Sequence, residues 1–311
     1  MKAPRRIKII IGTRGSELAL AQTRLVINEL QTRWGGLDFE TRIIKTRGDD
    51  SKTAIKDIRA GRKGMFTGAI GRELIKKKIH LAVHSAKDLP STLAPGTEIA
   101  AVLPRAMAQD VLVATSRCDL ESLPRDGIVA TGSVRRQHQL RWTRPDLEIV
   151  ELRGNVPTRL AKLGSGQWHG IILASAGLQR LGLHTNALSV EFDGSTFSTA
   201  ILPEEIFVPA GGQGVIAMQI RSDNLQLRDM LDAVNDFDTR LSLRAEREFL
   251  RLLRADCNQP VGVLATVNGV NMKIRGQIFD LGATVPRQGL VEGPSEDAER
   301  LAAELFETTK K

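Results

Sequence analysis

Five short segments of the sequence place small, hydroxylated and basic residues directly after an apolar run. They cover residues 13–16, 84–88, 131–136, 153–159 and 175–180. Each segment is expected to end a strand and open a helix, where unpaired backbone N–H groups attract anions. The arginines add planar guanidinium groups that bind a carboxylate through two hydrogen bonds. The pattern therefore predicts a cleft for a ligand that carries several carboxylates or phosphates.

The net charge of the chain also indicates an anionic partner, although composition disfavours nucleic acid. The 311 residues carry a formal net charge of +8, and aromatic residues make up 4% with no Tyr. Base-stacking platforms are therefore scarce. No P-loop pattern and no GxGxxG after a strand occurs, so a nucleotide is not indicated either. The five histidines lack the spacing of metal ligands, and no metal is expected.

Strand-like and helix-like patterns alternate through the first two thirds of the chain. Strands are expected at residues 7–11, 39–44, 81–84, 111–114, 128–130, 147–152 and 171–174. Helices are expected after Ser16, over residues 65–78, and near Ser133, Asn155 and Ser175. Such alternation is typical of α/β domains with mixed or parallel sheets, in which ligands bind beyond the carboxyl ends of the strands.

The last third of the chain has a different pattern. Residues 186–198 are polar and are predicted to form an irregular surface excursion. From Asp236 the sequence predicts a long charged helix to about Arg254, strands at 261–267 and 272–279, and a final helix from Ser295. This order of elements indicates a smaller α+β domain.

The cellular location expected from the sequence is the cytoplasm. No apolar run approaches the roughly 18 residues that span a bilayer. The first six residues, MKAPRR, are basic but are followed by neither an apolar segment nor a cleavage site, so no secretory signal is expected. The two cysteines, Cys118 and Cys257, cannot form a disulfide framework, which fits a reducing compartment.

Nine segments, in the same order from residue 7 to residue 262, resemble the porphobilinogen deaminase family. They are TRGSELALAQ at 13–22, TRGD at 46–49, KGMF at 63–66, AVHSAKDLP at 82–90, SVRRQ at 133–137, LRGNV with TR at 152–159, AGLQRLG at 176–182, PAGGQG at 209–214 and CNQPVG at 257–262. One such segment would be weak support, but nine in register identify the chain as a member.

The resemblance implies an α/β fold in which two periplasmic-binding-protein-like domains form a clamshell beside a small C-terminal α+β domain. Domain 1 would comprise residues 1–104 and 214–233, domain 2 residues 105–213 and domain 3 residues 234–311. The implied cofactor is dipyrromethane, joined to Cys257 through a thioether. Porphobilinogen would lose ammonia to give an azafulvene, which the growing chain attacks; after four additions hydrolysis would release hydroxymethylbilane. The enzyme would be a transferase and a monomer, with a small-molecule substrate and neither nucleic acid nor membrane as a partner.

The resemblance also implies roles for individual residues. Asp88 would be the catalytic carboxylate, which holds the pyrrole N–H and stabilises positive charge as ammonia leaves. The cofactor would be bound by Lys87, Ser85, Thr131, Ser133, Arg135, Arg136, Arg159 and Gly177, in addition to Cys257. The substrate would be bound by Arg14, Ser16, Arg153, Arg180, Lys63 and Gln213.

Two departures from the family pattern and several alternative interpretations accompany these assignments. Ala255 and Asp256 stand where the family usually has two glycines, and a carboxylate beside Cys257 disfavours the thiolate and would slow cofactor attachment. Thr67 and Gly68 replace a usual Lys-Glu pair. Taken alone, a strand-end arginine is most often a solvated charge, Asp88 could be a salt bridge or helix cap, and Cys257 could be a small buried hydrophobe. A non-catalytic clamshell protein that binds a polycarboxylate, or a nucleic-acid-binding module, is the alternative function.

Overall fold

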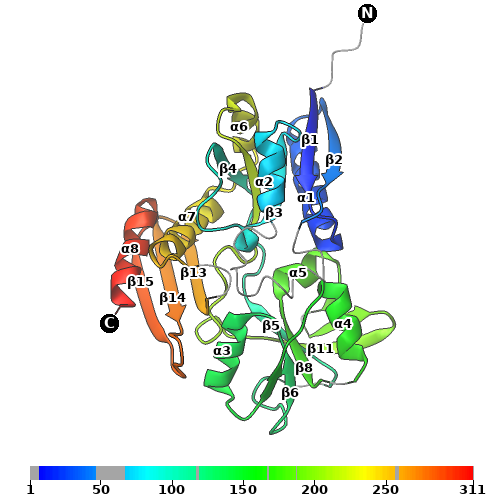
Figure 1. The fold of residues 1–311 in the computed structure, drawn as a ribbon, viewed down its shortest axis with the longest axis vertical. Helices are drawn as coiled ribbons and strands as arrows, with labels where there is room; N and C mark the ends of the chain where they lie inside the picture. The colour runs from blue at the N-terminus through cyan, green and yellow to red at the C-terminus, as the bar shows by residue number, and fades with distance from the viewer. Residues whose placement is uncertain are drawn as a thin grey trace, which may run out of the picture.

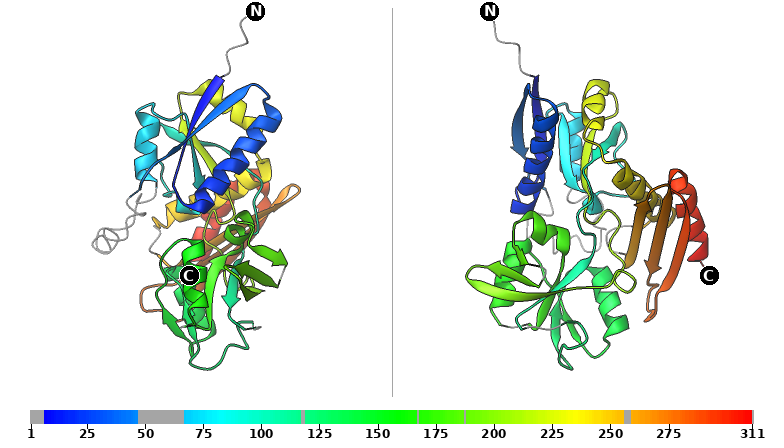
Figure 2. Two further views of the ribbon diagram at one scale, coloured as in Figure 1. Left: turned by 90° about the vertical axis from the view of Figure 1, so that its right-hand side faces the viewer. Right: turned by 180° about the vertical axis from the view of Figure 1, so that it is seen from behind.

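The computed structural model describes residues 7–46, 67–116, 119–166, 168–186, 188–255 and 259–310. Within these ranges the chain forms three β-sheets, which lie in three parts of the molecule (Figure 1). In Figure 1 the first sheet is at the top, the second at the bottom and the third at the left. The views in Figure 2 agree and place the third sheet beside the junction of the other two.

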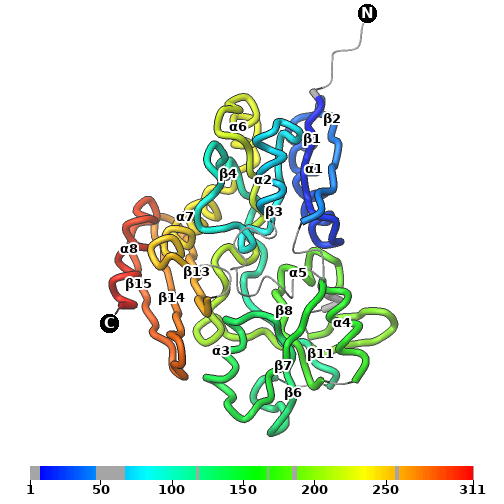
Figure 3. Tube along the Cα trace, in the orientation of Figure 1, coloured from blue at the N-terminus to red at the C-terminus, as the bar shows by residue number. Residues whose placement is uncertain are grey.

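The first sheet is mixed and has the strand order β2-β1-β3-β12-β4. β1 runs parallel to β2 and β3, whereas β12 runs antiparallel to both β3 and β4. The chain therefore leaves this sheet after β4 and returns at β12, having built the whole second sheet in between. Figure 3 shows β4 in the upper part of the trace and β8 and β11 of the second sheet in the lower part. The strands are β1 (Ile7–Thr13), β2 (Leu37–Ile43), β3 (Leu81–Ser85), β4 (Thr97–Val102) and β12 (Ile216–Arg221).

Three helices belong to the first sheet: α1 (Glu17–Arg33), α2 (Gly68–Ile75) and α6 (Leu225–Asp232). The Ser16 hydroxyl caps α1 by accepting a hydrogen bond from the Ala19 N–H at 3.3 Å. The predicted helix over 65–78 extended too far at its C-terminal end, because Lys77 has a φ of 58°, a left-handed conformation that stops a helix. Residues 65 and 66 lie outside the described residues.

The second sheet has the order β7-β6-β8-β5-β11-β10-β9. β6 is parallel to β7 and β8, and β5 is antiparallel to β8 and β11. Its strands are β5 (Asp110–Ala114), β6 (Ile128–Ala130), β7 (Glu148–Val150), β8 (Gly170–Ala174), β9 (His184–Asn186), β10 (Ser189–Phe192) and β11 (Ser195–Ile201). Its helices are α3 (Val134–Thr143), α4 (Val156–Gly164) and α5 (Ser175–Arg180).

The prediction of an irregular excursion at 186–198 was wrong, because β10 and β11 form an antiparallel hairpin there. Its turn uses Asp193 and Gly194, both with positive φ, as a tight hairpin turn requires. Val190 and Phe197 pair across the hairpin and are buried in the core of the second sheet. The polar composition of the segment reflects its other, solvent-facing side.

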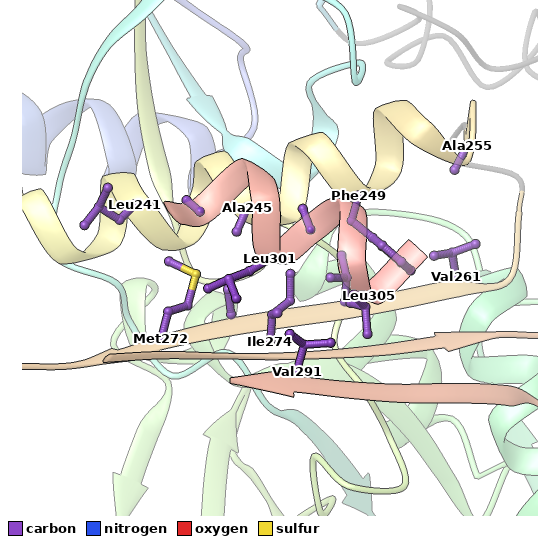
Figure 4. Close-up of a cluster of buried hydrophobic side chains, with 14 of the residues drawn as sticks. Leu241, Ala245, Phe249, Ala255, Val261, Met272, Ile274, Val291, Leu301 and Leu305 are labelled. Carbon is purple, nitrogen blue, oxygen red and sulfur yellow. The ribbon is translucent and has the colours of Figure 1, made fainter. Parts of the chain in front are cut away.

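The third sheet is an antiparallel meander of β13 (Val261–Asn268), β14 (Asn271–Ile278) and β15 (Arg287–Pro294). α7 (Phe237–Leu252) and α8 (Ala298–Thr308) pack together on one face of it. Figure 4 shows Phe249 of α7, Leu305 of α8 and Ile274 of β14 meeting in this core. The expected final helix begins as a 3₁₀ turn over Ser295–Asp297 and continues as α8.

The predicted fold class, α/β followed by a small α+β domain, is confirmed by this arrangement. The domain boundaries stay a prediction; the strands of the three sheets occupy residues 7–102 with 216–221, 110–201, and 261–294. Among the described helices, none is both long and apolar enough to cross a membrane.

Candidate functional site

A cavity of about 290 Å³ lies where the three sheet regions meet, and we call it the central cavity. This volume is at the lower end of the range for ligand sites, roughly 300–1,000 Å³. Its wall is formed by the turn after β3, the start of α3, α4, the segment before β12, α7 and the start of β13. Of the predicted site residues, those that line it are Lys87, Asp88, Ser133, Arg135, Arg136, Arg159 and Gln213.

Asp88 reaches the central cavity because β3 ends in a 3₁₀ turn, Ala86–Asp88, that carries the chain across the sheet edge. Its Oδ2 lies 3.8 Å from the Nη1 of Arg14. Arg14 directly follows β1, which is the neighbour of β3 in the sheet. Both side chains are partly exposed, 34% for Asp88 and 24% for Arg14, so water weakens this pair. Asp88 thus lies beside a cation and lines the central cavity.

Arg135 and Arg136 open α3 and are both buried, at 5% exposure each. Their charges are met by the fully buried carboxylate of Asp110, the first residue of β5. Arg136 Nη2 donates to Asp110 Oδ1 at 2.6 Å, and Arg135 Nη2 lies 2.9 Å from Oδ2 as an ion pair without hydrogen-bond alignment. The two guanidinium groups keep the pKa of Asp110 far below its usual range, against the effect of burial.

Lys87 and Gln213 extend this buried group toward the first sheet. Lys87 Nζ donates to Gln213 Oε1 at 3.3 Å, while Gln213 Nε2 donates to Asp110 Oδ1 at 2.7 Å. Burial, together with the charge of Arg136, lowers the pKa of Lys87 to about 8. The ammonium therefore sits in a poorly hydrated position where an anion would be a favourable neighbour.

Arg159 adds a further cation to the cavity wall from α4. Its Nε donates to the Gly154 carbonyl at 2.8 Å, which turns the guanidinium back over the start of the helix. Burial lowers the pKa of Arg159 to about 10, and the charge of Arg136 acts in the same direction. Arg159 still carries its charge near neutral pH.

Seven predicted site residues lie outside the cavity lining and have structural contacts of their own. Ser16 caps α1, Ser85 exchanges hydrogen bonds with the Gln22 amide, and Thr131 accepts from the Ser133 N–H. Arg180 donates to the Gly214 carbonyl, and burial lowers its pKa to about 10. The remaining three are Arg14, beside Asp88, Arg153, paired with Glu151, and Gly177, in the first turn of α5 near Leu18.

Lys63 and Cys257 lie outside the described residues, so their predicted roles are not placed. The described residues on either side of 256–258 are informative, because Ala255 and Gln259 both line the central cavity. The chain on each flank of the Cys257 segment is therefore at the cavity wall.

Three charged residues at or near the central cavity were missed by the sequence reasoning. Asp110 begins β5 one residue before the strand that the apolar pattern predicted. Arg247 lines the cavity from α7, where its Nη2 donates to the Pro90 and Ser91 carbonyls. The buried Glu246 binds Arg105 and the Gly212 N–H, each at 2.6 Å. Asp110 directly precedes a strand that the sequence predicts, but nothing local indicates its role because its partners lie far away in the sequence.

The donors around the central cavity fit a ligand with several carboxylates. Among the described residues, the buried Nε atoms of Arg135 and Arg136 have no hydrogen-bond partner. Leaving such donors unpaired is costly unless a ligand accepts from them. A dipyrromethane, with its acidic side chains, is such an acceptor. The described residues contain no cluster of His, Cys, Asp or Glu that could hold a metal ion.

Fold and cavity together define an α/β protein with a third, smaller domain and a cationic site for a polycarboxylate. Two family models match the chain: porphobilinogen deaminase, dipyromethane cofactor binding domain, over residues 9–229, and porphobilinogen deaminase, C-terminal domain, over residues 241–311. The chain belongs to the porphobilinogen deaminase family, as the sequence motifs predicted.

The chain is similar to relatives over nearly its whole length and, at much lower identity, to solved structures. The chain is 39% identical to the porphobilinogen deaminase of Moorella thermoacetica, covering 96% of this chain and 92% of that protein. It is 41% identical to that of Syntrophomonas wolfei, covering 95% and 92%. Among solved structures, the Bordetella pertussis BvgS periplasmic VFT2 domain is 16% identical with a TM-score of 0.41, covering 73% of this chain and 86% of that one. An ancestral cationic amino acid solute binding protein is 9% identical with a TM-score of 0.43, covering 74% and 88%.

Proposed function

We propose that this chain is a hydroxymethylbilane synthase, a transferase that joins four porphobilinogen molecules with the loss of four molecules of ammonia. A dipyrromethane cofactor, when bound, supplies the pyrrole carbon to which the first unit is joined, and hydrolysis finally releases hydroxymethylbilane. Membership of the porphobilinogen deaminase family supports the activity and the cofactor. The structural observation that carries the proposal is the pair of buried arginines that line the central cavity and whose Nε atoms have no hydrogen-bond partner.

The cofactor is assigned to the most buried part of the site. Arg135 and Arg136 offer their unpartnered N–H groups, and Lys87 and Arg159 add charge from two other directions. Ser133 adds a hydroxyl group at the cavity wall, and Thr131, Ser85 and Gly177 are assigned to the cofactor from the family resemblance alone. Hydrogen bonds from charged donors to carboxylates are about twice as strong as neutral ones, so this group can anchor a polycarboxylate.

The substrate is assigned to a second group of residues, most of which are cations. Arg14 lies beside Asp88, and Gln213 joins the two walls through Lys87 and Asp110. Ser16, Lys63, Arg153 and Arg180 complete this assignment from the family resemblance. Because each cycle adds a unit with two more carboxylates, different arginines would be engaged at different stages of elongation.

Asp88 is assigned as the catalytic carboxylate. Its position at the cavity lets it accept a hydrogen bond from a pyrrole N–H. When the C–N bond of porphobilinogen breaks, ammonia leaves and positive charge develops on the pyrrole, which a fixed carboxylate stabilises. The proton displaced when the new carbon–carbon bond forms is lost from the pyrrole ring beside this carboxylate.

The thioether between Cys257 and the cofactor is tested by the intact mass of the purified protein. The expected result is a mass increase of two pyrrole units, mapped to the peptide that contains Cys257. Cys257→Ala should fold without the added mass and without turnover, while the control Cys118→Ala should keep both. An active protein with an unmodified Cys257 would contradict the proposal.

We also propose that the protein acts in the cytoplasm as a monomer on a small-molecule substrate, with neither a nucleic-acid nor a membrane partner. The proposal is supported by the biosynthetic family to which the chain belongs. Light scattering on the cofactor-loaded protein tests the oligomeric state, and a mass of twice the chain would contradict it.

A further inference from the structure

Asp110 lies at the centre of the buried network, and the proposed function assigns it no role. Its carboxylate is fully buried and contacts Arg135, Arg136 and Gln213. It reaches them from β5, whereas the arginines come from α3 and Gln213 comes from the segment before β12. One carboxylate therefore joins three separate stretches of the chain directly behind the cavity wall.

The remaining contacts of the two arginines show that their orientation is fixed from several sides. Arg135 Nη1 donates to the Val208 carbonyl at 2.8 Å and to Gln139 Oε1 at 2.9 Å. Arg136 Nη1 donates to the Ile172 carbonyl at 2.8 Å. With Nη1 and Nη2 engaged in each case, the unpartnered Nε of each guanidinium is held in one direction.

The charge of Asp110 and its position have opposite expected effects on ligand binding, and this difference makes its role testable. As a negative charge beside an anion site, it weakens the attraction of the site for carboxylates. As a shared counter-ion, its carboxylate lies between two adjacent guanidinium groups and offsets the repulsion between their charges in a poorly hydrated place. A protein that only needed positive charge would be better without Asp110, so its presence indicates a positioning role.

We infer that Asp110 is a positioning residue for the proposed activity: it holds Arg135, Arg136 and Gln213 in the arrangement that receives the carboxylates of the cofactor and the substrate. Through Gln213 it also fixes the ammonium of Lys87, which is 3.3 Å from the Gln213 Oε1. Asp110 itself is not among the residues that line the central cavity. The inference rests on the proposed function, because the ligand is the polycarboxylate that the proposed function requires.

The experiment uses the full-length Asp110→Asn variant, which keeps the size of the side chain and removes its charge. Three quantities are measured: the fraction of protein that carries the cofactor, by intact mass; the KM for porphobilinogen; and the Tm. A positioning role predicts a lower loaded fraction and a KM raised roughly 10- to 100-fold, the effect of losing one charge-assisted contact. A KM below that of the wild type would mean that Asp110 only dilutes positive charge, and would overturn the inference.

A matched control separates positioning from general stability. Asp146 binds Arg144 through two hydrogen bonds, at 2.6 and 2.8 Å, in the same part of the chain but outside the cavity lining. Asp146→Asn should lower the Tm without changing the loaded fraction or the KM. If Asp110→Asn behaves in the same way as this control, its role is structural and the inference fails.

A second pair of variants covers the case in which Asp110→Asn does not fold. The double variant Arg135→Met/Asp110→Asn removes one charge of each sign, a change that buried pairs often tolerate. It is compared with Arg135→Met alone, and the inference predicts a further rise in KM because Arg136 has lost its counter-ion. An equal KM in the two variants overturns the inference. A wild-type protein that is inactive with porphobilinogen would instead contradict the proposed function itself.

Discussion

The ends of β6 and β7 differ sharply although both strands are followed within six residues by arginine. β6 is followed by Thr131, Gly132 and Ser133 before its two arginines, and β7 is followed by Glu151 and Leu152 before Arg153. After β6, Arg135 and Arg136 are buried and paired with Asp110 at the central cavity. After β7, the side chain of Arg153 is 39% exposed, pairs with Glu151 two residues away and is absent from the cavity lining.

The difference comes from the position of each strand in the second sheet. β6 lies inside the sheet, between β7 and β8, whereas β7 is at the edge. An interior strand end is covered by other parts of the chain, so its cations need a buried counter-ion and gain a fixed orientation. An edge strand leaves its arginine in water, where an ion pair contributes little and the side chain keeps its freedom. A strand-end arginine thus becomes a preorganised donor only where tertiary contacts enclose it.

Asp88→Asn tests whether the exposure of a site residue alone predicts its contribution to activity. Among the variants, it has the largest expected effect on kcat. At 34% exposure Asp88 resembles Arg153 rather than Arg136. We nevertheless expect kcat to fall by about 10²–10³-fold, because the variant removes a preorganised charge from the developing cation. The measurement is kcat with porphobilinogen on protein whose loading has been confirmed by mass. Asp88→Glu should retain more activity than Asp88→Asn, and a fully loaded Asp88→Asn enzyme with nearly wild-type kcat would make Asp88 structural.

Arg136→Leu tests whether a buried arginine after β6 contributes to cofactor binding. The variant removes the donor to the Ile172 carbonyl and to Asp110, and it removes the unpartnered Nε of a residue that lines the central cavity. Cofactor loading should fall roughly 10- to 100-fold, the effect of one lost charge-assisted contact. Intact mass after expression gives the loaded fraction. Normal loading of Arg136→Leu would show that burial of the arginine serves the fold alone.

The pH dependence of kcat/KM tests whether the buried cations are charged when the ligand binds. Burial lowers the pKa of Lys87 to about 8, so the ammonium is charged below this pH and neutral above it. Carboxylate binding should therefore weaken as the pH rises, with kcat/KM falling about tenfold per pH unit above 8. The charged groups that act on Lys87 are Arg136, Asp88, Asp110 and Arg135.

Lys87→Arg is the matched variant for this profile, because arginine stays charged through the alkaline range. The alkaline decline should move to higher pH in Lys87→Arg while the acid side of the profile stays in place. A decline at the same pH in both proteins would assign it to another group.

Arg153→Leu has the smallest expected effect on the early steps. Its side chain is partly exposed and paired with Glu151, so the loaded fraction should stay within about twofold of wild type and the stability within about 0.5 kcal/mol. If Arg153 binds carboxylates of the later units, Arg153→Leu should accumulate enzyme-bound intermediates with more pyrrole units than those that accumulate in Arg136→Leu. Anion-exchange separation of these intermediates makes the comparison. Identical profiles in the two variants would refute stage-specific roles for the arginines.

Much of the site could be predicted because strand ends are recognisable locally. The apolar run before Ser85 and the polar residues after it placed Lys87 and Asp88 at a sheet edge, and both line the central cavity. The same reasoning failed for residues 186–198, where, among the described side chains, a hairpin buries only Val190 and Phe197 and has few other apolar residues. β15 was also missed, because its alternation is interrupted by glycines that pack against α8, such as Gly289 against Leu305.

The sequence by itself determined many of the strands and helices, the cations at their ends and the family, because these depend on local periodicity and on contiguous motifs. Only the tertiary structure decided which cations are buried and what they bind. Asp110 meets Arg136 across 26 positions and Gln213 across 103, contacts that no local pattern contains. Whether a charge is enclosed depends on which strands become neighbours, and enclosure is what turns a common surface arginine into an oriented donor.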